Sequence, residues 1–298
     1  MATNDETYGS VLIHLYAVAR KLEGEGQYNV AKLARAAADS LLRTAAYPIE
    51  LPSQKEQLAS EVLAIAERLD DLEVHVDLVE SLKAGASALG EGRLPMFDET
   101  PHPYVCRTCG HVELYLPSSN CPRCNAWPRT FRRYPPVYWL EAMDPFEVTN
   151  WLLRTPDEVM RLINGIGEDD MCREIVEGEW TIRNVLTHLR DAQGVLDFRV
   201  NLLIEKDNPT IESKAVFEWA KEESERPASS MEIFNTYLGS RRKTLVTLRG
   251  IPLEDWWREG RHEEFGTISI KQQASYFATH ELTHLPQIEF LRERLSAS

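Results

Sequence analysis

Apolar residues recur every three to four positions along residues 7–88. The pattern begins in YGSVLIHLYAVARKLEG and continues in the alanine-rich QYNVAKLARAAADSLLRTAAYP, which stops near Pro48. A third stretch follows Pro52 and carries LASEVLAIAERLDDLEVHVDLVESL. Such spacing is typical of amphipathic helices, and helices this close in sequence usually pack as an antiparallel bundle. The pattern therefore predicts an N-terminal helical bundle.

The helical period is absent from residues 94–136. This segment contains PMFDETPHPYVCRTCGHVELYLPSSNCPRCNAWPRTFRRYPP, which is rich in proline, aromatic residues and cysteine. Pro135 and Pro136 mark a boundary, because consecutive prolines favour a loop. We expect a small middle module here.

A helical pattern resumes near residue 144. Each main helix of this part begins with a recognisable start signal. These signals are Asp144-Pro145, Thr181 and the capping-box patterns Ser229-x-x-Glu232 and Ser269-x-x-Gln272. Four main helices with one long connection predict a four-helix bundle. The chain is thus predicted to be mainly α, with domains at residues 1–93, 94–136 and 137–298.

Composition and charge narrow the functional classes. The 298 residues are 43% hydrophobic and 27% charged, as in ordinary globular proteins, and 33 Lys and Arg against 47 Asp and Glu give a net charge of −14. This balance argues against binding to nucleic acid or to anionic membranes, which needs clustered positive charge. The N-terminus lacks the basic region of a signal peptide, and no apolar run reaches about 18 residues. We expect a cytoplasmic protein.

Four of the five cysteines form two C-x-x-C pairs, Cys106 with Cys109 and Cys121 with Cys124, separated by eleven residues. In a reducing compartment this pattern indicates a metal site, and thiolates favour tetrahedral zinc or a single iron. Gly110 and Asn125 follow the two pairs, and both residue types readily adopt the positive φ that turns amide N–H groups toward the sulfurs. The fifth cysteine, Cys172, is expected to be inert.

The segment YVCRTCGHVELYLPSSNCPRCNAWPRTFRRY resembles a rubredoxin-type module, especially the one that ends rubrerythrins. An aromatic residue, Tyr104, precedes the first cysteine by two positions, and the knuckles read CxxCG and CPxC. The resemblance implies one-electron iron chemistry, although the same four ligands hold structural zinc equally well.

The preceding RKLEGEGQYNVAKLARAAADSLLRTAAY resembles the rubrerythrin helix pair, in which the alanine-rich helix carries E-x-x-H. Leu41 to Thr44 occupy that position here, and Glu73, His75 and Glu80 do not have the required spacing. We therefore expect a ferritin-like shape without di-iron ligands, serving as an interaction or dimerisation scaffold.

Residues 280–284 read HELTH, which matches the His-Glu-x-x-His pattern of zinc peptidases. His280 and His284 lie on one helical face, where both imidazoles can reach one metal. Only fourteen residues follow, too few for the distant Glu helix of one peptidase class. The other class requires Gly and His where Gln287 and Phe290 stand. The chain is therefore not expected to be a peptidase of either class.

WTIRNVLTHLRD and the later GTISI and HELTHLPQI instead resemble the DinB-like (YfiT-like) metalloprotein superfamily, over about residues 145–296. The resemblance implies a site of three histidines, His188, His280 and His284, that holds a divalent metal such as zinc, nickel or iron and leaves a position open for water or substrate. Pro286 departs from the small residue that most members have there, and is expected to kink or restart the helix.

Two acidic residues are candidates for catalysis. Asp191, three residues after His188, could orient an imidazole or bind water, or could be a solvated carboxylate. Glu281 is rotated by about 100° from His280, and packing at the bundle surface is favoured over contact with the water. The remaining histidines have no partner at ligand spacing and are not expected to bind metal. Some tryptophans are expected in the core or in a pocket wall. The histidines are His14, His75, His102, His111 and His262, and the tryptophans are Trp180, Trp219, Trp256 and Trp257.

The DinB-like resemblance implies a small-molecule transferase or hydrolase in which the metal activates a low-molecular-weight thiol or water. Two alternatives remain open. One is a non-catalytic redox or stress-response protein with rubredoxin-type iron, and the other is a structural dimer scaffold. Visible colour separates iron from zinc at the cysteines, and a homodimer is compatible with exposed bundle faces.

Overall fold

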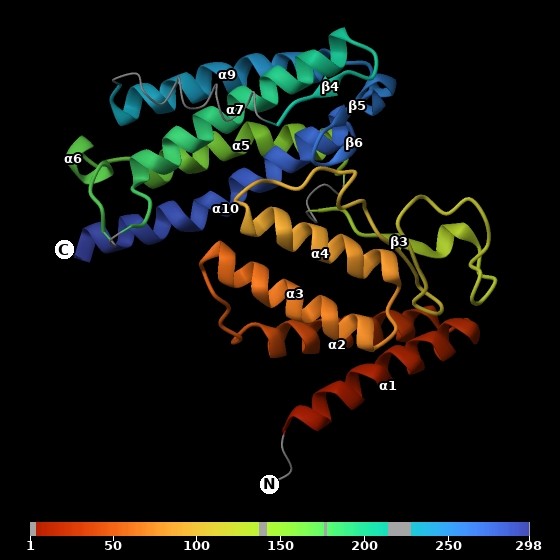
Figure 1. The fold of residues 1–298 in the computed structure, drawn as a ribbon. Coiled ribbons are helices and arrows are strands. Elements are labelled where there is room, and N and C mark those ends of the chain that lie inside the picture. The colour runs from red at the N-terminus through yellow and green to blue at the C-terminus, as the bar shows by residue number, and fades with distance from the viewer. Residues whose placement is uncertain (1–3, 137–141, 176–177, 214–227, 298) are drawn as a thin grey trace. The chain divides into compact units, whose positions relative to one another are not determined.

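The structure, a computed structural model, describes residues 4–136, 142–175, 178–213 and 228–297. Its fold is mainly α-helical, as predicted (Figure 1). The chain separates into two compact units. One comprises residues 1–94 and 103–133, and the other residues 95–102 and 134–298. The cysteine segment therefore shares a unit with the N-terminal helices, whereas residues 95–102, assigned to the middle module from the sequence, belong with the C-terminal helices.

The N-terminal helices form two hairpins. Helices α1 (Asn4–Gly24) and α2 (Tyr28–Ala46) pack on each other, as do α3 (Lys55–Asp71) and α4 (Val76–Gly90). The side chains buried in these helices are small, with one valine among alanines: Ala19, Ala31, Ala38, Ala59, Ala66, Val79, Ala86 and Ala88. Four helices are thus present where the sequence predicts a bundle, and their assignment as a rubrerythrin-like domain stays a prediction.

The cysteine segment forms a three-stranded antiparallel sheet in the order β2-β1-β3. The central strand β1 (Tyr104–Cys106) pairs with β2 (Val112–Glu113) and with β3 (Phe131–Arg133), which follows a short 3-10 helix, η1 (Pro128–Thr130). Cys106 is opposite Phe131 in the second pairing. The sheet therefore holds the first cysteine knuckle at the end of its central strand.

Helices α5 (Pro145–Ile163), α7 (Ile182–Glu205), α9 (Ser230–Gly250) and α10 (Ile270–Ala297) form the C-terminal bundle. The start signals match the structure. The Asp144 carboxylate accepts from the amide of Phe146, and capping boxes open α7 and α9. Helix α10 continues through Pro286, so the expected restart of the helix there is wrong.

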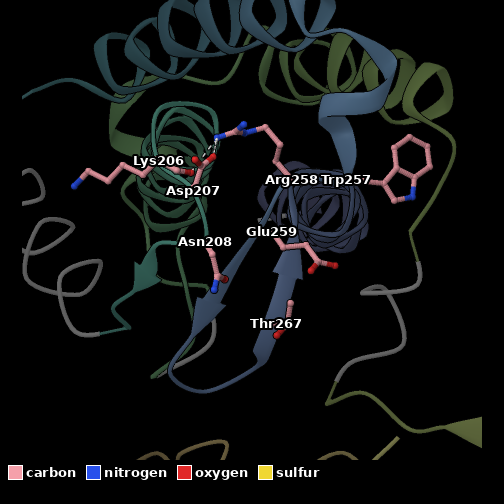
Figure 2. Close-up of a pocket in the computed structure, with 7 residues that line it drawn as sticks. All are labelled: Lys206, Asp207, Asn208, Trp257, Arg258, Glu259 and Thr267. Atoms are coloured by element: carbon pink, nitrogen blue, oxygen red, sulfur yellow. Dashed lines mark hydrogen bonds and ion pairs between the residues drawn. The ribbon is translucent and has the colours of Figure 1, made fainter. Parts of the chain in front are cut away.

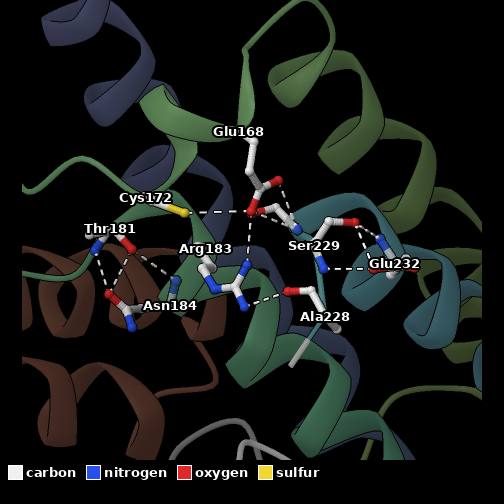
Figure 3. Close-up of polar contacts among 9 residues, drawn as sticks. Glu168, Cys172, Thr181, Arg183, Asn184, Ala228, Ser229 and Glu232 are labelled. Carbon is white, nitrogen blue, oxygen red and sulfur yellow. Dashed lines mark hydrogen bonds and ion pairs between the residues drawn. The ribbon is translucent and has the colours of Figure 1, made fainter. Parts of the chain in front are cut away.

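Glu168, in the short helix α6 (Glu168–Met171), ties the N-terminal ends of two bundle helices together. Its carboxylate accepts from the amide and hydroxyl of Ser230 at 2.9–3.0 Å and from Arg183 Nη1 at 2.8 Å (Figure 3). The exposed thiol of Cys172 donates to the same carboxylate at 3.5 Å. An anion at a helix N-terminus is stabilising because the first amides of the helix lack partners.

A second small sheet, in the order β4-β5-β6, lies in the C-terminal unit. Strand β4 (Thr210–Ile211) runs parallel to β5 (Glu259–His262), which pairs antiparallel with β6 (Gly266–Ser269). The 3-10 helix η3 (Leu253–Trp257) precedes β5. A Cβ added at Gly260 would come within 2.7 Å of Leu203, so this glycine permits the close approach of strand and helix.

The buried apolar side chains of the C-terminal unit form two clusters. One surrounds Leu152, Leu196 and Phe277, and the other surrounds Leu186, Phe234 and Ile288. Among the described helices, none is long and apolar enough to cross a membrane.

Candidate metal centre

Two helices bring the three predicted histidines together. His188 lies on α7, and His280 and His284 lie one turn apart on α10. The Nε2 atom of His280 is 3.2 Å from that of His188 and 3.3 Å from that of His284. The three rings meet edge to face, with interplanar angles of 70–83°. Their ligand atoms therefore converge on one point from two elements far apart in the sequence.

The spacing of these nitrogen atoms suits a shared metal ion. Two ligands at the usual zinc–nitrogen distance of about 2.0–2.1 Å in tetrahedral geometry lie roughly 3.3 Å apart. Burial, followed by the neighbouring His284, lowers the pKa of His188 to about 4. Burial and the other two histidines lower the pKa of His280 to about 4. The two imidazoles are thus neutral at pH 7, as metal ligands must be.

Gln287 fixes the tautomer of His284. Its side-chain oxygen lies 3.0 Å from His284 Nδ1, and because an amide oxygen only accepts, this ring nitrogen carries the proton. The Nε2 lone pair then points toward the other two histidines. A partner of this kind is a usual companion of metal-binding histidines. In the sequence Gln287 stands out only as a departure from the peptidase pattern, although its position three residues after His284 is a usable signal.

Aromatic rings pack against the outer faces of the cluster. Trp180 stacks on His284 with an interplanar angle of 6°, and Tyr276 stacks on His280 at 9°. Trp256 is buried in the core, one of the two places expected for it, and Trp219 lies outside the described residues. For Trp180 the expectation of a core or pocket-wall position stays a prediction. The role of Tyr276 went unpredicted, although it precedes His280 by four residues, the spacing of neighbours on a helix face.

Asp191 is buried rather than solvated. It pairs with Arg190, whose Nε lies 2.9 Å and Nη2 2.8 Å from the same carboxylate oxygen. The alternative of a solvated carboxylate is therefore wrong. Asp191 does not belong to the group of converging ligand atoms, and its proposed support of the metal stays a prediction.

Glu281 lies in the interior of the bundle, not at its surface as favoured from the sequence. It is fully buried, forms an ion pair with Arg241 and accepts a hydrogen bond from Tyr237 Oη at 3.2 Å. The guanidinium also donates to the Leu152 carbonyl at 2.8 Å and to Gln193 Oε1 at 2.5 Å. The rotation of about 100° per residue explains the difference, since His280 faces α7 while its neighbour faces the core. These contacts leave no carboxylate oxygen of Glu281 without a partner.

The four predicted cysteines also converge. The sulfurs of Cys106 and Cys124 are 3.7 Å apart, those of Cys109 and Cys121 are 3.6 Å apart, and the four together lie within 4.8 Å. Gly110 and Asn125 have φ of 78° and 59°, as the sequence predicts. No ion pair or disulfide among the described residues involves these four thiols, so they form a second group of candidate ligands.

Backbone amides surround the sulfurs. Burial raises the pKa of Cys106, but the amides of Cys109 and Thr108 outweigh it and hold that pKa at about 6. Burial raises the pKa of Cys109 to about 12. A thiolate at Cys106 close to a protonated Cys109 is an arrangement that favours a cation, because a bound metal requires both sulfurs as thiolates.

Residues 152–288 match the model of the DinB superfamily. The C-terminal half of the chain is DinB-like. A Bacillus cereus (strain 03BB102) protein named "Putative metal-dependent hydrolase" is 28% identical over 144 residues, which are 47% of this chain and 81% of that protein. A Bacillus anthracis (strain CDC 684 / NRRL 3495) protein of that name is 27% identical over the same shares.

One solved structure is also similar to the DinB-like half. YfiT from Bacillus subtilis, described as having an unusual four-helix bundle topology, has a TM-score of 0.46 and 18% sequence identity. The match covers 55% of this chain and 94% of that one.

A surface pocket of about 340 Å³ lies elsewhere in the DinB-like unit (Figure 2). It is lined by Lys206, Asp207, Asn208, Trp257, Arg258, Glu259 and Thr267. Trp257 thus forms a pocket wall, as expected, but none of the histidines lines this pocket. Lys206 directly follows the C-terminal end of α7 at Glu205, which lies 17 residues, roughly 25 Å along the helix, from His188.

Proposed function

We propose that the DinB-like unit is a metal-dependent enzyme that acts on a small molecule, with hydrolysis as its reaction. The observation that carries this proposal is the convergence of three Nε2 atoms from α7 and α10 at 3.2–3.3 Å. Three nitrogen ligands leave one position free, which distinguishes catalytic from structural zinc sites. His188, His280 and His284 would hold the ion.

A divalent ion supplies Lewis-acid chemistry and lowers the pKa of a coordinated water or thiol. The chain's own contribution is to keep the ligands neutral and oriented. Burial disfavours protonated His188 and His280, and Gln287 holds the proton of His284 on Nδ1. Trp180 and Tyr276 stack on the rings of His284 and His280 and so limit their rotation.

The names of the relatives favour hydrolysis over thiol transfer. The matched Bacillus proteins, whose alignments cover 47% of this chain, are named "Putative metal-dependent hydrolase". Thiol transfer to or from a low-molecular-weight thiol is the second candidate, since the same ion would activate sulfur as well as water. Glu281 takes no part in the proposed chemistry, because its carboxylate is committed to Arg241 and Tyr237.

The four-cysteine group is proposed to bind a second metal, zinc in a structural role or iron in a rubredoxin-like one. The amides around Cys106 favour bound thiolates with either metal. A redox function for the whole protein is the competing proposal. It requires iron, which would give strong visible absorption.

The deciding experiment is element-by-element metal analysis of the full-length protein. We would compare wild type, His280→Ala and the control His14→Ala, which changes an exposed histidine on α1. Two metals in wild type and the control, and one in His280→Ala, are expected. One metal in all three proteins, with no gain on added Zn²⁺ or Ni²⁺, would refute the enzyme proposal.

A homodimer and a cytoplasmic location remain predictions. The exposed apolar side chains of the N-terminal helices, such as Ile13 and Leu33, favour association of two chains. Light scattering coupled to size exclusion would measure the mass, and a value near 34 kDa would contradict the dimer.

A further inference from the structure

Three arginines are buried in the bundle, and they differ in whether an acidic side chain pairs with them. Arg190 pairs with Asp191, and Arg241 pairs with Glu281. Arg199 on α7 is only 6% exposed, yet no carboxylate of the described residues lies within ion-pair distance of it. A buried charge without a partner is costly, so natural proteins usually pair it or supply it with a ligand.

The contacts of Arg199 leave one edge of its guanidinium unused. Nη1 donates to the side-chain oxygen of Gln273 on α10 at 3.2 Å. The Nε atom is buried and has no hydrogen-bond partner among the described residues. A guanidinium binds a carboxylate best through two parallel N–H bonds, and the edge that includes Nε offers such a pair.

A second unpaired donor comes from the β5–β6 turn. His262 is 1% exposed, and its Nδ1 accepts hydrogen bonds from the amides of Glu264 and Phe265 at 3.1 and 3.2 Å. The ring proton is therefore on Nε2, which is buried and has no partner among the described residues. Burial, assisted by the positive charge of Arg199, lowers the pKa of His262 to about 3, so the ring is a neutral donor near a cation.

Arg199 lies on α7, the helix that also carries His188. His262 ends strand β5, in which Gly260 packs closely on Leu203, one helical turn after Arg199. Contacts at 3.2 Å join His188 to His280 and Arg199 to Gln273, so α7 and α10 run antiparallel along this seam. Tyr276 lies between the two contacts on α10. It stacks on the His280 ring and is also within electrostatic reach of Arg199. A single side chain thus links the proposed metal centre to the unpaired arginine.

The local charge selects the kind of anion. Arg199 contributes one positive charge, His262 is neutral, and the nearby Glu264 is half buried. Burial raises the pKa of Glu264, although Arg199 opposes the effect. A dianion such as phosphate would bring more negative charge than one arginine balances, whereas a carboxylate would match it.

We propose that Arg199 and His262 bind the carboxylate group of a small-molecule ligand in the α7–α10 region that also carries the three-histidine centre. That this ligand is the substrate rests on the proposed function. The substrate class is then an elongated carboxylic acid, since Arg199 follows His188 by 11 residues, about 16 Å along α7, and the reacting group must reach the histidines while the carboxylate stays at Arg199.

The test measures binding of simple carboxylates through the melting temperature of the full-length protein. Acetate and benzoate are compared with acetamide and benzamide, their neutral counterparts, with chloride keeping the ionic strength constant. A ligand that binds only the folded state raises the melting temperature in proportion to its occupancy. We expect the carboxylates and not the amides to stabilise wild type. Arg199→Gln should weaken the carboxylate affinity about tenfold or more, because charged hydrogen bonds are lost.

Three further variants keep the test decisive. Arg242→Gln removes an exposed arginine of α9 and should behave as wild type. His188→Ala breaks the metal centre and should still bind the carboxylates, which excludes their direct coordination to a metal. If Arg199→Gln does not fold, Arg199→Lys is used instead. It keeps the positive charge but lacks the paired N–H donors of the guanidinium, and it should weaken binding several-fold.

Equal responses to acids and amides, or equal affinities in wild type and the Arg199 variants, would overturn the inference. Tighter binding of inorganic phosphate than of acetate through Arg199 would overturn the ligand class. If wild type responds to carboxylates but its three histidines bind no metal even with added Zn²⁺ or Ni²⁺, the proposed function is refuted and the carboxylate site stands.

Discussion

The two helical regions of this chain bury different kinds of side chain. The helices of the N-terminal region bury alanine almost exclusively and expose large apolar residues, Ile13 at 74% and Leu33 at 64%. The C-terminal bundle buries leucine, isoleucine and phenylalanine together with a network of charged and polar groups. Both regions thus show the sequence pattern of amphipathic helices. Buried charged and polar side chains occur in the region that holds the candidate histidine centre.

The largest difference in stability between the two regions is expected when one partner of the buried ion pair is removed. Glu281→Ala leaves Arg241 charged and unpaired in the core, and we expect the free energy of unfolding of the C-terminal unit to fall by about 3–5 kcal/mol. The matched control is Glu23→Ala in the N-terminal unit, whose carboxylate pairs with a half-buried Arg35 at 2.7 Å. It should cost less than about 1 kcal/mol. Denaturant unfolding measures both, and equal costs would contradict the comparison.

Replacing a leucine by alanine should likewise cost more stability in the C-terminal unit than in the N-terminal one. Leu196 is fully buried, and Leu196→Ala should destabilise the C-terminal unit by about 2–5 kcal/mol. Leu33→Ala, at an exposed position of α2, should change stability by less than about 0.5 kcal/mol in the monomer. Thermal unfolding at low protein concentration provides the measurement. A large loss for Leu33→Ala at that concentration would mean that the α2 face is covered.

The two candidate metal groups should respond independently. Gln287→Leu removes the acceptor that orients His284, and we expect metal affinity at the histidines to fall about 10–100-fold. Competition with a chelator measures this affinity, and the metal of the cysteine group serves as internal control. Parallel loss of both metals would show a general defect in folding.

The smallest effect concerns pH. The pKa of His188 and of His280 is about 4 in the folded protein, against an ordinary value of 6.5 in an unfolded chain, so between these pH values the unfolded chain binds more protons. The metal-free C-terminal unit should therefore lose stability as the pH falls from 6.5 to 4, by on the order of 1 kcal/mol after solvent screening.

The His188→Gln/His280→Gln double variant isolates this contribution. Its free energy of unfolding should depend less steeply on pH in that window than that of wild type. Urea unfolding at several pH values gives the two slopes, and identical slopes would mean that these imidazoles remain solvated.

Local signals predicted much of the fold and of both ligand groups. The starts of α5, α7 and α9 follow from capping residues within four positions, and Gly110 and Asn125 adopt the φ values that their residue types permit. The order of the three histidines came from a family resemblance. The metal itself stays a prediction.

Long-range partners account for what the sequence did not reveal. Glu281 pairs with a residue 40 positions away, and no local pattern identifies Arg241 as its partner. The strands β4, β5 and β6 have two to four residues each and form only because tertiary structure aligns them. The buried position of Arg199 likewise depends on α10, which lies about 70 residues later.

The ion pair of Glu281 also sets the rotation of α10 about its own axis. Glu281 and His280 are adjacent, so a slip by one position would turn the helix by about 100° and carry the carboxylate out of the core. Such a slip would separate two buried charges, at a cost of several kcal/mol. The ion pair therefore fixes the rotation of α10 so that both of its histidines face His188, whether or not an ion is bound.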